Sequence, residues 1–296
     1  MMIIKIIGNN TKYLLKKALQ LAFFISTIAS IYEIAIGKII EKDTCVIKAI
    51  LYLLLAFVIL YVVSFIILSL RLCFKKQFEI FSTDKHSVYL HFEDLLNNKI
   101  VNDQSKQKYI VINVNRCFDT IVNNQLISEN TLHGIVFKKL YDEKKYNEMT
   151  LQTAIDNSLN DIHYINISKA DKPQGNLKRY DVGSVVKIDD NNTKSYFLLA
   201  MSTFDKNLNA HTSKQDYGLA IQRLIEYCDS KSQGFPVLMP LLGSNFSRAV
   251  AAGKDCYSDT LGYLINSLKI NKDIINCDFH IYILPQDKHK INFYNL

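Results

Sequence analysis

Long apolar runs near the start of the chain give way to short ones further on. Residues 49–70 contain no charged side chain. As a helix this run would rise roughly 33 Å, against about 30 Å for the hydrocarbon core of a bilayer. Residues 18–40 form a weaker candidate, because Glu33 and Lys38 place charges within it. We therefore predict an N-terminal transmembrane helical hairpin, with helices at about residues 18–40 and 47–72.

The charges that flank this predicted hairpin indicate its orientation. Lysines and arginines cluster before the first segment and after the second, whereas the short connection carries Glu41 and Asp43 among fewer basic residues. Basic flanks stay on the cytoplasmic side. A signal peptide is the alternative, but the run is long and no small-residue cleavage site follows it. We expect a multi-pass protein of the inner or plasma membrane whose N-terminus and remaining chain are cytoplasmic.

Small side chains recur at every fourth position of the first segment, at Ala18, Ala22, Ser26 and Ser30. Such a stripe lets two helix backbones approach closely. Glu33 lies near the same face, where a carboxylate needs protein or water as a neighbour. The stripe predicts a homo-oligomer. Because small residues are common in membrane helices, a chance pattern is an equal alternative.

Beyond residue 77, strand-like runs alternate with amphipathic helices. Two helical faces stand out, one from Tyr217 to Cys228 and one from Leu261 to Leu268, with Ser258 as a candidate N-cap of the second. This alternation predicts an α/β domain with a mixed sheet flanked by helices, and a ligand crevice at the carboxyl ends of the strands. The predicted strands are residues 87–92, 109–114, 182–188, 195–200, 235–240 and 279–284.

Charge and cysteine content exclude two classes of function. Residues 1–77 carry ten of the 35 lysines and arginines but three of the 28 acidic residues. The whole excess of seven positive charges therefore lies there, and the rest of the chain has no surplus with which to bind a nucleic acid. The six cysteines are widely spaced, with no Cys-x-x-Cys pair and no histidine at ligand spacing, so we expect neither a metal site nor a disulfide framework.

Candidate chemistry lies at the turns that follow apolar strands. The run PLLGSNFSR, residues 240–248, leads from a strand into a turn of small residues around Gly243. Glycine tolerates positive φ, so such a turn can direct several backbone N–H groups at one phosphate. Two other junctions are alike. IVINV precedes Asn115 and Asp119, and Asp94 follows a strand, where it could accept a hydrogen bond from an amino group or cap a helix.

Taken in order, the motifs HFEDLL, IVINVNRCFDT, ENTLHGIVFKKLY, RYDVGSVVKI, YFLLAMSTFD and VLMPLLGSNFSR resemble a macro domain of the kind found in ThsA effectors of Thoeris antiviral defence. The resemblance covers about residues 78–296 and leaves 1–77 as the membrane hairpin. It implies a membrane-anchored effector that senses an ADP-ribose-derived signal, such as histidine-linked ADP-ribose made by a TIR-domain protein. Binding would then drive oligomerisation and membrane disruption.

The resemblance also implies roles for individual residues. Asp94 would lie near adenine, Asn115 with Asp119 at the distal ribose, and His133 and Gly243 in the two diphosphate loops. The implied ligand-binding set is Asp94, Asn115, Phe118, Asp119, Leu132, His133, Gly134, Leu242, Gly243, Ser244, Asn245, Phe246, Ser247 and Arg248. Ordinary macro domains have a glycine-rich loop where this chain has Leu-His-Gly. An equal alternative for His133 is a loop residue that is hydrogen-bonded to the backbone. The alternative for Arg248 is a solvated residue on a helix surface.

Two other functions remain open from the sequence. An ADP-ribosyl hydrolase tethered to the membrane would need a positioned water, which Asp119 could orient. A small transporter or channel subunit with a regulatory domain overlaps with the effector. The sequence shows no nucleophile elbow, P-loop or zinc-protease helix, so we assign no catalytic residue, metal or cofactor.

Overall fold

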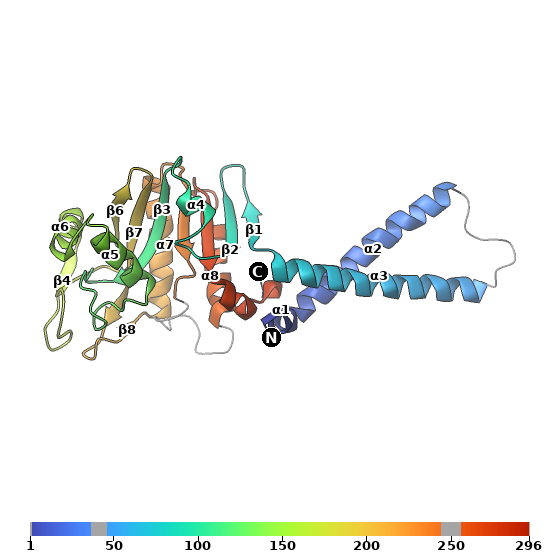
Figure 1. Cartoon of the computed structure of the whole chain (residues 1–296), viewed down its shortest axis with the longest axis horizontal. Helices are drawn as coiled ribbons and strands as arrows, with labels where there is room; N and C mark the ends of the chain where they lie inside the picture. The colour runs from blue at the N-terminus through green and yellow to red at the C-terminus, as the bar shows by residue number, and fades with distance from the viewer. Residues whose placement is uncertain (1, 37–45, 244–255, 296) are drawn as a thin grey trace. The chain divides into compact units, whose positions relative to one another are not determined.

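The computed structural model describes the chain except for residues 1, 37–45, 244–255 and 296 (Figure 1). The chain divides into two compact units. A helical unit comprises residues 1–76 together with Lys288–Asn295, and a sheet-containing unit comprises Gln77–Asp287. The sequence placed residues 288–295 with the second unit, whereas the structure packs them with the N-terminal helices.

The helical unit contains α1 (Met2–Asn9), α2 (Thr11–Ile36) and α3 (Val46–Phe74). Helices α2 and α3 contact each other, with the rings of Phe23 and Phe57 5.1 Å apart between centroids.

One helix in the described part of the chain is long and apolar enough to cross a membrane. It is Ile50–Phe74 within α3, with a mean hydropathy of 3.0 and very little of its surface buried. This supports membrane anchoring through the second predicted segment. The first segment falls largely in α2, in whose described residues no candidate membrane span is found. The hairpin and its orientation therefore stay predictions.

Part of the small-residue stripe packs inside the helical unit of a single chain. Ala18 and Ala22 are fully buried in the helical unit, while Ser26 is half-buried and Ser30 is exposed. Small side chains at the first two positions thus permit close packing inside the unit. Oligomerisation through this face stays a prediction.

A buried asparagine fastens the C-terminal segment Lys288–Asn295 to the N-terminal helices. The Asn10 side chain is 1% exposed, and its Nδ2 donates to the carbonyl of Ile291 at 3.0 Å. In return, the backbone N–H of Phe293 donates to Asn10 Oδ1 at 2.7 Å. Sequence reasoning missed this contact, since it joins residues more than 280 positions apart.

The main sheet of the second unit has the order β1-β2-β10-β9-β3-β7-β6, with β8 beside β7. From β2 to β7 neighbouring strands run parallel, and β1, β6 and β8 add antiparallel edges. The strands are β1 (Gln77–Ser82), β2 (Ser87–Phe92), β3 (Lys108–Asn115), β6 (Val185–Asn191), β7 (Lys194–Phe204), β8 (Ala210–His211), β9 (Val237–Pro240) and β10 (Phe279–Ile283). A separate pair joins β4 (Tyr164–Asn166) to β5 (Lys178–Tyr180). The predicted mixed sheet is confirmed.

Helices cover both faces of this sheet (Figure 1). Alternate residues of β3, such as Ile110 and Ile112, pack with Phe137 of α5 and Ile155 of α6 in one core. Helix α7 contacts β7 and α8 on the other face. The helices are α4 (Lys99–Asn102), α5 (Leu132–Asp142), α6 (Glu148–Ser158), α7 (Lys214–Lys231) and α8 (Cys256–Ile270), followed by the 3₁₀ turns η1 (Pro285–Lys290) and η2 (Phe293–Asn295).

Most elements agree with the sequence pattern. The predicted strand 87–92 coincides with β2, and the faces from Tyr217 to Cys228 and from Leu261 to Leu268 are buried in α7 and α8. The N-cap prediction for Ser258 was wrong. Helix α8 already includes Cys256, so Ser258 lies inside it, where it is 2% exposed.

Candidate functional site

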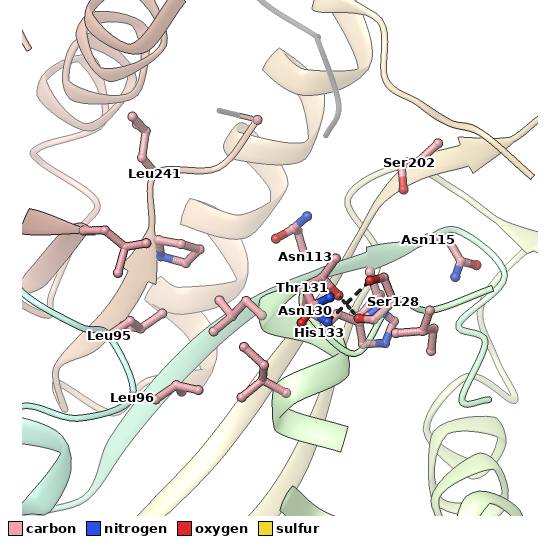
Figure 2. A pocket seen from close by; sticks show the side chains of 18 of the residues that line it. Leu95, Leu96, Asn113, Asn115, Ser128, Asn130, Thr131, His133, Ser202 and Leu241 are labelled. Atoms are coloured by element: carbon pink, nitrogen blue, oxygen red, sulfur yellow. Dashed lines mark hydrogen bonds between the residues drawn. The ribbon is translucent and has the colours of Figure 1, made fainter. Parts of the chain in front are cut away.

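A cavity of about 660 Å³ opens at the carboxyl ends of the parallel strands, as the fold class predicted. Its walls come from the ends of β2, β3, β7, β9 and β10 and from the start of α5. Figure 2 shows Leu95 and Leu96 toward one end, Asn115 and Ser202 toward the other, and His133 between them. Ligand sites typically have volumes of about 300 to 1,000 Å³. The cavity can therefore hold a molecule the size of a dinucleotide.

Neutral polar groups dominate the polar part of the wall. None of the described residues that line the cavity is a lysine or an arginine, and its acidic residues are Glu93, Asp94 and Asp287. Among the described residues, an anion bound here has backbone N–H groups and neutral side chains as donors. The amide, serine and threonine side chains in the wall are Asn113, Asn115, Asn124, Gln125, Ser128, Asn130, Thr131, Ser202 and Asn209.

Helix α5 starts at the cavity. Thr131 is its N-cap, with Oγ1 accepting from the N–H of Gly134 at 3.1 Å and donating to the carbonyl of Ser128 at 2.7 Å. The first helical residues, Leu132 and His133, line the cavity. Backbone N–H groups in the first turn of a helix have no partner within the helix, and the macrodipole there favours an anion. This end of α5 can therefore bind a phosphate.

Gly134 allows this helix start to lie against the preceding loop. A Cβ atom at Gly134 would lie 2.1 Å from the carbonyl oxygen of Ser128. Any larger residue must push α5 and the loop apart. The glycine therefore positions the N–H groups of α5, although Gly134 itself does not line the cavity.

His133 lines the cavity and has one polar atom without a partner. Its Nε2 is buried and has no hydrogen-bond partner among the described residues. The ring packs edge-on against Phe137, with centroids 4.3 Å apart. Burial lowers the pKa of His133 to about 3, so the ring is neutral near pH 7. A buried polar atom without a partner costs free energy, which a ligand hydrogen bond would offset.

Gly243 belongs to the turn that follows a different strand, β9. Its φ of 78° is in the region that favours glycine, and it lines the cavity together with Leu241. Leu242 is buried and does not line the cavity, and its carbonyl accepts from the Tyr217 hydroxyl at 3.2 Å. The predicted ligand contacts Ser244, Asn245, Phe246, Ser247 and Arg248 lie outside the described residues.

Asp119 does not itself line the cavity; it lies in a buried polar network next to Asn115, which does. Its side chain is 1% exposed and contacts Lys172 Nζ at 2.8 Å, and its Oδ1 accepts from the N–H of Asn176 at 2.6 Å. Lys172 is itself fully buried and also donates to the Asn176 carbonyl at 2.9 Å. Neighbouring Phe118, at a φ of 50°, packs in the core. Neither Phe118 nor Asp119 lines the cavity, and a ligand contact for either residue stays a prediction.

A pair of histidines lies next to the cavity between β2 and β10. His91 Nε2 and His280 Nδ1 are 2.9 Å apart, and both residues are buried. The His91 ring stacks on Tyr282, which lines the cavity, at 4.5 Å between centroids. Burial lowers the pKa of each histidine to about 4. Both rings are therefore neutral near pH 7.

The comparison with protein families is decisive. A family model described as "Thoeris protein ThsA, Macro domain" matches residues 88–284. The chain belongs to the ThsA macro-domain family. The resemblance found in the sequence is thereby confirmed.

Individual relatives are more distant. A Thoeris protein ThsA from Bacillus amyloliquefaciens (strain Y2) is 28% identical over 194 residues. That match covers 64% of this chain and 62% of the relative, so it spans less than two thirds of the relative's length. Among solved structures, an Oceanobacillus iheyensis macrodomain variant is 7% identical, covering 72% of this chain and 89% of its own, with a TM-score of 0.42. A Streptomyces coelicolor macrodomain protein is 10% identical, covering 62% and 93%, with a TM-score of 0.31. The family assignment rests on the sequence match.

The structure places five residues of the predicted ligand-binding set in one cavity. Asp94, Asn115, Leu132, His133 and Gly243 all line the one cavity. Asp94 also folds its own loop, since its Oδ1 accepts from the N–H of Leu96 at 2.8 Å. Asn115 does likewise at the end of β3, where its Oδ1 accepts from the N–H of Cys117 at 2.9 Å.

Several lining residues were missed from the sequence. Asn113 and Ser202 lie at the ends of β3 and β7, and Asn124 and Ser128 come from the loop before α5. Asn115 pairs with Ser202 across β3 and β7. A rule that examines every polar residue at the carboxyl end of each predicted strand would have found Asn113 and Ser202.

Proposed function

We propose that this protein is a membrane-anchored sensor whose macro domain binds an ADP-ribose-type nucleotide. The observation that carries the proposal is the start of α5 at the cavity wall, with Gly243 of the β9 turn in the same wall. Two sets of backbone N–H groups can bind a diphosphate without a cationic side chain. Membership of the ThsA macro-domain family supports the same ligand class.

The binding proposal is tested by calorimetry on the full chain purified in detergent, with ADP-ribose as the probe. We expect binding, and we expect His133→Ala to weaken it by about 2- to 10-fold, the worth of one neutral hydrogen bond. Met149→Ala is the control, because Met149 is 80% exposed on α6 and does not line the cavity. No heat of binding at millimolar ADP-ribose would refute the proposal.

The proposed role is sensing in antiviral defence, in response to a signal made by a TIR-domain protein. Histidine-linked ADP-ribose is the signal that the family resemblance implies, and occupancy would promote oligomerisation and membrane disruption. A ligand shifts a conformational equilibrium only through different affinities for the two states. Liposome leakage and mass measurement with and without the nucleotide test this step. Leakage of equal size without nucleotide would contradict it and favour a simple channel.

A route from the cavity to the helices is supported by how the chain continues after β10. Asp287 lines the cavity, and the next residue, Lys288, belongs to the helical unit. Lys288 Nζ donates to the carbonyls of Cys73 at 3.1 Å and Lys75 at 2.6 Å, at the end of α3. We propose that ligand contacts at β10 reach α3 through this short segment.

We propose binding rather than hydrolysis as the activity of the cavity. Asp119, the residue that could orient a water, is bound by Lys172 and Asn176 and does not line the cavity. Mass spectrometry of ADP-ribosylated protein after incubation with the full chain tests this. Release of free ADP-ribose at a rate that depends on enzyme concentration would establish the hydrolase instead.

A further inference from the structure

Basic side chains from three segments of the chain meet at one end of the helical unit. Lys12 and Lys16 lie at the start of α2, four residues apart and so on one face of the helix. Lys75 and Lys76 follow directly after α3, and Lys290 belongs to the 3₁₀ turn η1. All five side chains are exposed. We call these five residues the basic collar.

Contacts within the helical unit hold the three segments together. The ammonium of Lys288, two residues before Lys290, donates to the carbonyl of Lys75 at 2.6 Å. The ammonium of Lys16 lies 5.8 Å from the centre of the Tyr294 ring, in the same C-terminal segment. The start of α2 and the end of α3 are therefore joined through this segment, and the fold brings the five cations to one end of the unit.

The charge of the basic collar is not balanced by acids of the same unit. Among the described residues of the helical unit, Glu33 is the one acidic residue. It lies in the last turn of α2, at the opposite end of that helix from Lys12 and Lys16. Cations that lie near one another without acids between them create a positive potential that attracts anions. An anionic partner outside the protein would therefore stabilise this end of the unit.

The basic collar lies at the end of the helix that can cross a membrane. The 25 residues Ile50–Phe74 rise roughly 37 Å, against about 30 Å for the hydrocarbon core, so the end of this helix reaches the level of the lipid headgroups. Tyr294, beside Lys16, is 53% exposed. Exposed tyrosine is typical of the bilayer interface, where its ring is in apolar and its hydroxyl in polar surroundings. Both observations favour a lipid surface as the partner.

We infer that the basic collar binds the anionic headgroups of phospholipids in the bilayer surface around α3. The inference rests on the proposed function, because it takes the helical unit to be anchored in a membrane. Clustered cations beside a membrane helix attract anionic lipids, by about five-fold in affinity for each cation. Lys290 comes from the far end of the chain, so the collar is made by the fold and not by the flanks of the membrane helix alone. The protein therefore prefers membranes that contain anionic lipid.

The test is native mass spectrometry of the full chain in detergent, with phosphatidylglycerol and phosphatidylcholine of the same acyl chains at equal concentrations. We expect the parent to retain the anionic lipid about 10-fold or more over the zwitterionic one. In the combined variant Lys12→Gln, Lys16→Gln and Lys290→Gln this preference should fall to within about two-fold, because three of the cations are lost. Arginine at the same three positions should preserve it, since the charges remain.

The matched control changes three exposed lysines of the sheet-containing unit, Lys169, Lys214 and Lys272, to glutamine. The net charge then decreases by the same amount as in the collar variant. A preserved preference in the control supports the basic collar, and an equal loss would assign the effect to overall charge and overturn the inference. Thermal unfolding followed by circular dichroism checks that both variants fold.

Flotation of the reconstituted chain with vesicles of each lipid separates this inference from the proposed function. If the parent floats with neither vesicle, the proposed membrane anchoring fails, and the basic collar with it. If it floats but shows no lipid preference, or if the preference survives in the collar variant, the inference is wrong and the sensor proposal stands. Loss of the preference in millimolar inorganic phosphate would identify a soluble anion as the occupant and also overturn the inference.

Discussion

Replacement of Asp119 by alanine tests whether this residue stabilises the fold or contacts the ligand. In the structure, Lys172 is fully buried, and its ammonium contacts Asp119 at 2.8 and 3.0 Å. Asp119→Ala leaves that cation without its ion-pair partner and the N–H of Asn176 without its acceptor. Removal of one member of a buried ion pair costs about 3 to 5 kcal/mol.

This loss should be visible in thermal unfolding. For a domain of this size, 1 kcal/mol lowers the midpoint by roughly 2 to 4 °C, so we expect a decrease on the order of 10 °C. The chain has 17 tyrosines and no tryptophan, so circular dichroism or tyrosine fluorescence of the full chain in detergent can follow the transition. Asp119→Asn combined with Lys172→Met should recover at least half of the decrease, because the combination removes the unpaired cation and keeps an acceptor for Asn176.

Either of two results would refute the structural role of the Asp119–Lys172 ion pair. An unchanged unfolding midpoint for Asp119→Ala, together with loss of ADP-ribose binding, would place Asp119 at the ligand and not in a structural network. An equal decrease in the single and double variants would show that the ion pair is not the cause of the loss.

Three further predictions follow from the site and its surroundings. Gly134→Ala should weaken ADP-ribose binding and lower stability by about 1 to 3 kcal/mol, since the new Cβ meets the preceding loop; calorimetry and thermal unfolding measure the two effects. The folded-state pKa values of His91 and His280, about 4, lie below the unfolded value of about 6.5. Stability should therefore fall as pH decreases from 6.5 to 4, by up to about 3 kcal/mol for each ring, and the fall should be shallower in His280→Phe. Lys288→Met should leave ADP-ribose binding unchanged but reduce nucleotide-dependent liposome leakage, because it removes the donor to the last carbonyls of α3.

The strands and the position of the site could be predicted because they depend on local patterns. Strand β2 is an apolar run at the predicted residues, and the rule that ligands bind at the carboxyl ends of parallel strands places Asp94, Asn115 and Gly243 in one cavity. The ends of helices were less reliable. Ser258 has the chemistry of an N-cap, but residues earlier in the chain already belong to α8.

The ion pair of Asp119 could not be predicted from the sequence. Asp119 lies four residues beyond Asn115 and next to its side chain. Between them, Phe118 adopts a φ of 50° and packs in the core. The partner that holds the carboxylate, Lys172, is 53 residues away, so no local pattern indicates it. Packing of distant segments decides this residue, as it does the contact between Asn10 and the C-terminal segment.

The arrangement of donors in the wall bears on how a sensor of this kind could switch. A swing in population from 1:99 to 99:1 needs about 5.5 kcal/mol of differential affinity. One helix N-terminus supplies about 2 kcal/mol at most, and a hydrogen bond to a charged group about 1.5 to 3 kcal/mol. Neither α5 nor the turn at Gly243 is sufficient alone, whereas a diphosphate that binds both could reach the required value. Because these donors belong to segments on different strands, such a ligand favours the state in which β3–α5 and β9–β10 are held together. Under the proposed function, the chain continues from β10 within five residues to Lys288, whose ammonium donates to the end of α3, and this gives the ligand contacts a path to that helix.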